Sequence, residues 1–260
     1  MDILQTIIAH KQNEIRLQEE AVTRLQLEAL IETHAPCRSM KQALEASATG
    51  IIAEFKRRSP SKDWIKQEAD ASVIPASYEK AGAAALSILT DEQFFGGSLK
   101  DIRTARPQVT LPVLRKDFII SPYQLYQAKA VGADAVLLIA AVLTPEECRN
   151  LARLAHELQM EVLLELHSET ELNHINDCID MVGVNNRNLG TFHTDVANSF
   201  RLAKHLPHDK VLVSESGIAR PETVKQLREA GFRGFLMGET FMRTPCPADT
   251  LSQFIRSLSI

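Results

Sequence analysis

Acidic, basic and amide side chains stand at the ends of short apolar segments along most of this chain. The residues placed in this way include Glu54, Lys56, Lys116, Glu165, Asn185, Arg187 and Glu215. A lysine ammonium can donate a proton and a carboxylate can accept one, so the two together can supply general acid–base catalysis. Any one of them could equally be a solvated strand end or a structural ion pair, but a converging set of this size favours chemistry.

Eight short apolar segments repeat from residue 51 onward. They are IIAEF (51–55), AALSIL (84–89), LPVLR (111–115), AVLLIA (135–140), EVLLEL (161–166), MVGVN (181–185), VLVSE (211–215) and GFLMG (234–238). The segments between them have the spacing of amphipathic helices, and those at 121–133, 144–159 and 220–232 open with a proline, as helix N-termini do. We therefore expect eight strands, each followed by a helix, which implies parallel strands joined by right-handed crossovers.

Eight strand–helix units favour a closed (β/α)8 barrel, or TIM barrel, of the α/β class. No glycine-rich GxGxxG or GxxxxGK[ST] loop follows any strand, so an open nucleotide-binding sheet loses its usual support. Residues 1–260 are predicted to form this single domain, with residues 1–48 as an N-terminal helical extension. We expect the extension merely to pack on the barrel, although it could instead cover one of its ends.

In a barrel, catalytic residues come from the carboxyl ends of the strands and from the loops that follow. Side chains two apart on a strand share a face, so Glu54 and Lys56 should point the same way. The loops after the last two strands are SESGIARPE and MGETFMR. A phosphate often binds at such loops, so the backbone of Ser216–Gly217 and Gly238–Glu239 is a candidate site, with the Glu239 carboxylate pointing away.

Composition limits the partners of the chain. The formal net charge of −4 and the pI near 6.1 give no general reason to expect nucleic acid as a partner. No run of about 18 apolar residues occurs, so no membrane span is expected, and the N-terminus lacks a signal-peptide pattern. The four cysteines are scattered without a CxxC pair, which predicts four free thiols in a cytoplasmic protein.

Several segments resemble, in order and at matching intervals, those of the indole-3-glycerol phosphate synthases, barrel enzymes of tryptophan biosynthesis. The segments are IIAEFKRRSPS (51–61), LSILTDEQFFGGS (86–98), LRKDFII (114–120), ADAVLLI (133–139), LLELHSE (163–169), VGVNNRNL (182–189), SESGI (214–218) and FLMGETFMR (235–243). The N-terminal helices resemble the extension that precedes the first strand in this family. Together these segments are highly specific.

The resemblance implies conversion of 1-(2-carboxyphenylamino)-1-deoxyribulose 5-phosphate into indole-3-glycerol phosphate, carbon dioxide and water, with no cofactor and no metal. Lys116 would be the general acid for ring closure, and Lys56 would contact the substrate and act as the acid in dehydration. Glu165 and Glu54 are the candidate bases. The residues expected to orient hydroxyls and lysines are Asn185 and Glu215.

The resemblance also implies how this small phosphorylated substrate is held. The implied contacts are Arg187 at the anthranilate carboxylate, Pro60, Phe95, Phe118 and Leu137 in the aromatic pocket, with Phe192 as a looser candidate, and Ser59, Ser216, Gly217, Gly238 and Glu239 at the phosphate. The segment RRSPSK (57–62) is expected to be a mobile basic loop over the phosphate end. A monomer is expected.

Some residues depart from the family's usual pattern, and two other functions remain open. The departures are Asp63 and Trp64 after SPSK, Asn188 where aspartate is commoner, and Glu239 where serine is usual. Phosphoribosylanthranilate isomerase, another barrel, would share the phosphate loops, but it pairs a cysteine with an aspartate and no cysteine here ends a strand. A catalytically silent ligand-binding barrel would not need two lysines and two glutamates at its mouth.

Overall fold

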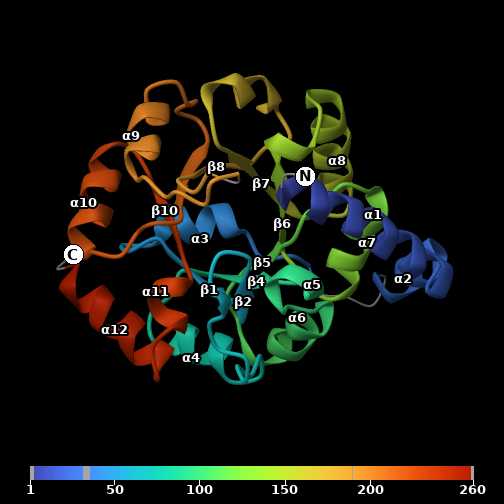
Figure 1. The fold of residues 1–260 in the computed structure, drawn as a ribbon, viewed down its shortest axis with the longest axis horizontal. Coiled ribbons are helices and arrows are strands. Elements are labelled where there is room, and N and C mark those ends of the chain that lie inside the picture. The colour runs from blue at the N-terminus through green and yellow to red at the C-terminus, as the bar shows by residue number, and fades with distance from the viewer. Residues whose placement is uncertain (1–2, 32–35, 189, 259–260) are drawn as a thin grey trace.

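The computed structural model describes residues 3–31, 36–188 and 190–258, and eight parallel strands within them close into a barrel. The strands are β1 (Ile51–Phe55), β4 (Ala85–Leu89), β5 (Val113–Lys116), β6 (Ala135–Ile139), β7 (Glu161–Leu166), β8 (Met181–Asn185), β9 (Val211–Glu215) and β10 (Gly234–Met237). Consecutive strands are neighbours, and β10 pairs with β1 to close the barrel (Figure 1). The predicted (β/α)8 barrel is therefore confirmed.

Helices surround the barrel (Figure 1). They are α4 (Ile74–Lys80), α5 (Glu92–Phe95), α6 (Leu99–Ala105), α7 (Pro122–Ala130), α8 (Pro145–Glu157), α9 (Ala197–Ala203), α10 (Pro221–Glu229), α11 (Glu239–Met242) and α12 (Pro247–Ser257), with 3-10 turns η1 (Arg106–Gln108), η2 (Ala140–Val142) and η3 (Glu169–His174). As predicted, α7 and α8 begin at proline, and the Ser121 and Thr144 side chains form capping boxes there.

The expectation that a helix of the same kind follows every strand is wrong after β7. Of the described residues between β7 and β8, only the 3-10 segment η3 is helical. The buried His174 ring is hydrogen-bonded to the carbonyls of Glu171 and Leu143, and Asn176 then accepts a hydrogen bond from the Cys178 N–H. Asparagine side chains that bond the nearby backbone compete with an α-helix, which accounts for the short turn.

Alternation along the strands separates two cores, as the spacing predicts. Ile52, Leu163 and Val213 belong to a cluster inside the barrel, whereas Ile51 and Phe55 join the larger cluster that packs against the outer helices. Glu54, Glu165 and Glu215 each come two residues after one of these inward-facing side chains, so they also face the inside of the barrel, at its carboxyl end. The interior is thus apolar below its mouth.

The expectation of an amphipathic helix at α7 is wrong, because this helix is buried around most of its circumference. Tyr123 through Ala130 are all buried. Helices α1 (Ile3–Ala21) and α2 (Arg24–Ile31) cover its outer face, and the Tyr123 hydroxyl donates to the carbonyls of Gln18 and Val22 at 3.0 and 2.7 Å. Figure 1 shows α1, α7 and α2 side by side at the edge of the barrel.

The N-terminal extension does more than pack on the barrel wall, so that expectation is also wrong. Met40 and Leu44 of α3 (Met40–Ala46) fill the amino end of the barrel, where Ser39 and Lys41 bond the Glu161 carboxylate at the start of β7. Ile7 of α1 joins the same interior cluster from the carboxyl end. Helices of the extension therefore cover both ends.

The expected mobile basic loop after β1 is instead a hairpin, β2 (Arg58–Ser59) with β3 (Asp63–Trp64). Arg57 forms a two-pronged ion pair with Asp101 of α6, at 2.6 and 2.8 Å. Arg58 pairs with Asp63 at 2.7 Å and stacks on Trp64. Arg57 therefore holds the hairpin to the barrel, whereas Arg58 joins its two strands, with the unusual Asp63 and Trp64 as its partners.

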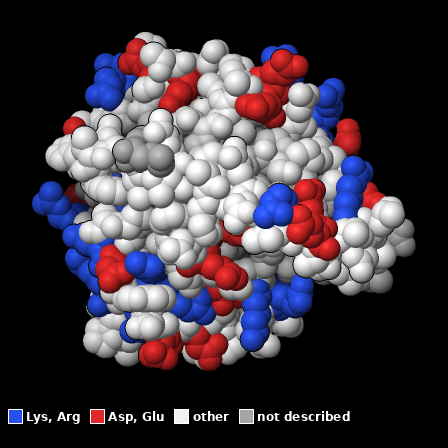
Figure 2. Space-filling model, turned by 45° about the vertical axis from the view of Figure 1, so that its right-hand side comes forward, with Lys and Arg blue, Asp and Glu red and all other residues white. Residues whose placement is uncertain are grey.

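Three expectations drawn from composition can be compared with the structure. All four cysteines are free thiols, as predicted. On the face drawn in Figure 2, positive and negative side chains occur together around a largely uncharged centre. None of the described helices is long and apolar enough to cross a membrane.

Candidate active site

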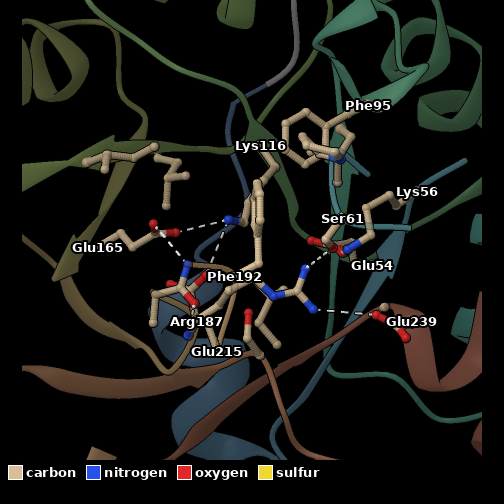
Figure 3. Close-up of a pocket in the computed structure, with 18 of the residues that line it drawn as sticks. Glu54, Lys56, Ser61, Phe95, Lys116, Glu165, Arg187, Phe192, Glu215 and Glu239 are labelled. Carbon is tan, nitrogen blue, oxygen red and sulfur yellow. Dashed lines mark hydrogen bonds and ion pairs between the residues drawn. The ribbon is translucent and has the colours of Figure 1, made fainter. Parts of the chain in front are cut away.

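A cavity lies at the carboxyl ends of the strands, and every predicted site residue except Ser59 lines it (Figure 3). The predicted residues in its wall are Glu54, Lys56, Pro60, Phe95, Lys116, Phe118, Leu137, Glu165, Asn185, Arg187, Glu215, Ser216, Gly217, Gly238 and Glu239, and the looser candidate Phe192 joins them. Ser59, in strand β2 of the hairpin, is buried, and Ser61, two residues later, lines the cavity instead. The barrel thus brings together residues that are up to 185 positions apart in the sequence, from Glu54 to Glu239.

Lys116 lies at the centre of the strongest charge cluster in this cavity. Its Nζ is 3.1 Å from Oε2 of Glu165 and 3.3 Å from Oε2 of Glu215. Both carboxylates are almost completely buried. The Asn185 amide donates to the other oxygen of Glu165 at 3.1 Å, which fixes the orientation of that carboxylate.

Burial and mutual attraction shift the pKa values of this cluster in different directions. Burial opposes the charge on Lys116, but Glu165, Glu215 and Glu54 outweigh it and raise the pKa of the ammonium. Burial would raise the pKa of Glu165, whereas Lys116 and then His167 lower it below its usual range. Burial raises the pKa of Glu215 to about 8 against the pull of Lys116, and the repulsion of Glu165 adds to the rise. At neutral pH the cluster therefore holds one cation, one anion and one neutral acid.

A second acid–base pair stands on β1. Lys56 Nζ lies 2.5 Å from Oε1 of Glu54, so the two residues point the same way, as their spacing predicts. Glu54 is buried, and Lys56 is only partly covered. In Figure 3 this pair and the Lys116–Glu165 pair face the cavity from different sides.

Two glycines make room for the buried carboxylates. A Cβ atom on Gly183 of β8 would lie 2.3 Å from Oε1 of Glu215, and one on Gly238 would lie 2.3 Å from Oε1 of Glu54. Non-bonded atoms cannot approach so closely. Gly238, predicted as a phosphate contact, therefore has a second task in admitting Glu54.

Replacing Gly183 by alanine is expected to lower kcat/KM by about 10²-fold, because the new methyl group would push Glu215 away from Lys116. The free energy of unfolding should fall by about 1–3 kcal/mol, as for other overpacked sites. Gly190→Ala is the matched control, since its nearest neighbour would lie at an ordinary 3.5 Å. Steady-state kinetics of both variants test this, and equal activities would contradict it.

The apolar wall of the cavity includes a part that the sequence patterns did not predict. Phe95 and Phe118 pack with their ring centres 6.0 Å apart, beside Leu137. Ile3, Leu4 and Ile7 of α1 also line the cavity. Their helical spacing is visible in the sequence, but nothing local indicates that the helix reaches the mouth of the barrel.

The end of the cavity near the last two loops is basic, with Lys62 from the RRSPSK segment and Arg243, which the sequence-based site did not include. A connected hollow is lined by Lys62, Arg187 and Arg243, together with Ser61, Gly217 and Thr240. Ser216 and Gly217 both have positive φ, of 67° and 76°, and form a sharp turn after β9. Gly217 does not stand at a helix N-terminus, because α10 begins only at Pro221, so the turn itself would have to hold an anion there.

The Glu239 carboxylate does not point away from the site, so that expectation is wrong. Its Oε2 lies 3.5 Å from Nη2 of Arg187, and Glu239 lines the cavity. Arg187 also donates to the Ser61 hydroxyl at 3.2 Å, as Figure 3 shows. Attraction to the guanidinium draws the carboxylate inward. Asn188 caps the next turn by accepting from the Gly190 and Thr191 N–H groups.

His167 is a further group near the chemistry that the sequence-based site omits. Its Nε2 lies 3.3 Å from Oε1 of Glu165, although His167 does not itself line the cavity. Its place at the end of β7, two residues after Glu165, is the signal that could have identified it. Within the described ranges, no three His, Cys, Asp or Glu side chains are grouped so that they could hold a metal ion.

The closed barrel and the buried lysine–glutamate pairs at its mouth define a (β/α)8-barrel enzyme of the acid–base type. The model of the family "Indole-3-glycerol phosphate synthase" matches residues 4–258. Proteins of that name from Bacteroides thetaiotaomicron and Bordetella pertussis are 66% and 42% identical over 257 and 259 residues, which is 99% and 98% of this chain and 99% of each relative. The chain belongs to the indole-3-glycerol phosphate synthase family, the carboxy-lyases of tryptophan biosynthesis.

Solved structures support the fold alone. Tryptophan synthase subunit alpha from Legionella pneumophila has a TM-score of 0.61 and 17% identity, covering 84% of this chain and 96% of that one. A chain of the tryptophan synthase a2b2 complex from Pyrococcus furiosus has a TM-score of 0.60 and 13% identity, covering 81% of this chain and 98% of that one. At such identity only the barrel architecture is shared.

Proposed function

We propose that the cavity binds 1-(2-carboxyphenylamino)-1-deoxyribulose 5-phosphate and converts it to indole-3-glycerol phosphate with the two lysine–glutamate pairs. The observation that carries this proposal is the Lys116 ammonium held between two buried carboxyl groups beside an apolar wall. A positioned cation can protonate the substrate ketone, while the wall folds the aromatic ring toward it.

Lys116 acts in ring closure. As the ring carbon that bears the carboxylate attacks the ketone carbon, the ketone oxygen takes a proton from Lys116 and becomes a hydroxyl group. Carbon dioxide then leaves from the ring carbon. A strongly held ammonium is a weak acid, so the neutral form of Glu215 matters: it leaves Glu165 as the one charged carboxylate in contact with Lys116.

The dehydration step uses the other groups. Lys56 protonates the departing hydroxyl, which leaves as water, and Glu165 or Glu54 takes up the proton that the indoline ring loses. Asn185 orients Glu165, and the Glu215 carboxyl group, whose Oε2 lies 3.3 Å from the Lys116 ammonium, orients that lysine and bonds a substrate hydroxyl.

The two charged ends of the substrate need cations. The phosphate lies at Ser216–Gly217 and Gly238–Glu239, with positive charge added by Lys62 of the basic RRSPSK segment and by Arg243, which the sequence-based site did not include. Arg187 holds the carboxylate that is lost as carbon dioxide, and Glu239 and Ser61 position its guanidinium. Ser61, and not the predicted Ser59, is thus the serine of this loop that lines the substrate site.

The pH profile tests the place of Glu215 beside the acid. Glu215 is neutral below about pH 8 and charged above it, so raising the pH adds a negative charge beside Lys116 and makes it a weaker acid. We therefore expect kcat/KM to fall on the alkaline side with an apparent pKa near that of Glu215, and we expect Glu215→Gln to remove or shift this limb. Rates from about pH 6 to about pH 10 provide the measurement. If the wild-type protein and Glu215→Gln lost kcat/KM over the same alkaline pH range, the proposed effect of Glu215 on Lys116 would be ruled out.

No observation favours the isomerase alternative, since none of the four cysteines lines the cavity. We further propose a cytoplasmic monomer. The free thiols support a reducing compartment, and the site is built from one chain. Sedimentation at assay concentration tests the monomer.

A further inference from the structure

Lys11 of α1 is a fully buried lysine next to the proposed active site. Its Nζ lies 2.9 Å from Oδ2 of Asp91, 3.0 Å from Oδ1 of Asp117 and 2.9 Å from Oε2 of Glu14. Its exposed fraction is 0%. Burial disfavours its charge, but Asp117, Asp91 and Glu14 outweigh burial and raise the pKa of the ammonium, so Lys11 is a cation at neutral pH.

The two aspartates that Lys11 contacts each fix a residue of the cavity wall. Asp91 follows β4 and caps α5 by accepting from the Phe94 N–H at 2.8 Å, and Phe95 on α5 lines the cavity. Asp117 directly follows Lys116 and accepts from the Phe118 N–H at 2.8 Å. Both aspartate side chains are buried.

The helix that carries Lys11 supplies a third part of the wall. Ile7, Lys11 and Ile15 are the buried residues of α1, spaced four apart on one face. Ile7 lies one turn before Lys11 and lines the cavity together with Ile3 and Leu4. Ile15, one turn after, packs with Tyr123 and Tyr126 of α7. The ammonium therefore joins α1, α5 and the end of β5 at one point.

We propose that Lys11 is a positioning residue for the reaction: its ammonium holds the apolar face of α1, the Phe95 helix and the Lys116–Phe118 segment around the aromatic part of the substrate. Lys11 does not line the cavity itself, so it acts through these elements and touches no reacting atom. The inference rests on the proposed function in taking the cavity as the substrate site.

Lys11→Met removes the charge and keeps most of the length of the side chain. We expect KM to rise by about 10-fold to 10²-fold, and to change more than kcat, because the wall that holds the substrate loosens while the acid remains. Amide hydrogen exchange across Ile3–Ala21 should become faster. Loss of stability alone would lower the amount of active enzyme, and hence the apparent kcat, but would leave KM unchanged.

Arg106→Met is the matched control. Arg106 forms a 2.5 Å ion pair with Asp134, which directly precedes β6, at the amino end of the barrel. This variant also loses a partly buried pair, so it should lose stability with a wild-type KM. A wild-type KM in Lys11→Met, or an equal rise in Arg106→Met, would overturn the proposal.

A milder variant keeps the test decisive if Lys11→Met does not fold. Asp91→Asn retains an oxygen to cap α5 but loses its charge toward Lys11, so a smaller rise in KM is expected. An unchanged KM in the folded variant would overturn the proposal.

Lys116→Ala, assayed in parallel, separates the positioning role of Lys11 from the proposed function of the cavity. If Lys116→Ala retains turnover, the assignment of the cavity fails; if it loses turnover while Lys11→Met keeps its KM, only the positioning role fails.

Discussion

Replacing Lys116 by alanine is expected to lower kcat by about 10²–10⁴ while the protein stays folded. The ammonium is the group that the proposed mechanism uses to protonate the ketone, and Lys56, paired with Glu54, is held on a different strand. Steady-state turnover, followed by the fluorescence of indole-3-glycerol phosphate, measures the loss.

Two controls separate catalysis from structure in this variant. Lys100→Ala removes an exposed lysine on α6 and should leave kcat unchanged. Thermal unfolding of Lys116→Ala should show a folded barrel, because without the cation burial favours the neutral form of both Glu165 and Glu215, so that no unpaired charge has to stay buried. Near-normal turnover with Lys56 intact would refute the assignment of Lys116 as the acid.

Replacing Glu165 by glutamine is expected to lower kcat by a similar factor of about 10²–10⁴, because the variant loses both the base and the anion that holds Lys116. The chain offers a matched control on the same strand. Glu161 begins β7 at the amino end of the barrel, where it bonds Ser39 and Lys41 of the extension.

In a (β/α)8 barrel, residues at the carboxyl ends of the strands serve function, and residues at the amino ends serve stability. The two glutamates, at opposite ends of β7, should therefore give opposite results when replaced. Glu161→Gln should lower the midpoint of thermal unfolding and largely keep kcat. Glu165→Gln should lower kcat and largely keep the midpoint of thermal unfolding. If the two variants lost activity equally, the division of roles along β7 would be wrong.

Local patterns were sufficient to predict the barrel and the convergence of its charged strand ends. Strand ends are set by short-range alternation, and the barrel geometry places those ends together, so Glu54, Lys116, Glu165 and Glu215 converge as expected. The glycine at 238 was recognised, although its contact with Glu54 depends on three-dimensional packing.

Features that depend on distant partners could not be predicted in this way. Arg57 looks like an anion-binding residue in the sequence, but Asp101, 44 positions later, takes its charge. The position of α1 over the cavity depends on Lys11 reaching Asp91 and Asp117, and a lysine within a helix ordinarily faces solvent. Such pairings follow from the fold and have no local signature.

The crystal structure of Lys116→Ala with bound 1-(2-carboxyphenylamino)-1-deoxyribulose 5-phosphate tests the central claim most directly. The account predicts the phosphate at Ser216–Gly217 and Gly238–Glu239, the aromatic ring against Phe118, and the ketone oxygen facing the space left by the Lys116 ammonium. A substrate bound with its phosphate outside these loops, or with its ketone oxygen turned away from position 116, would contradict it.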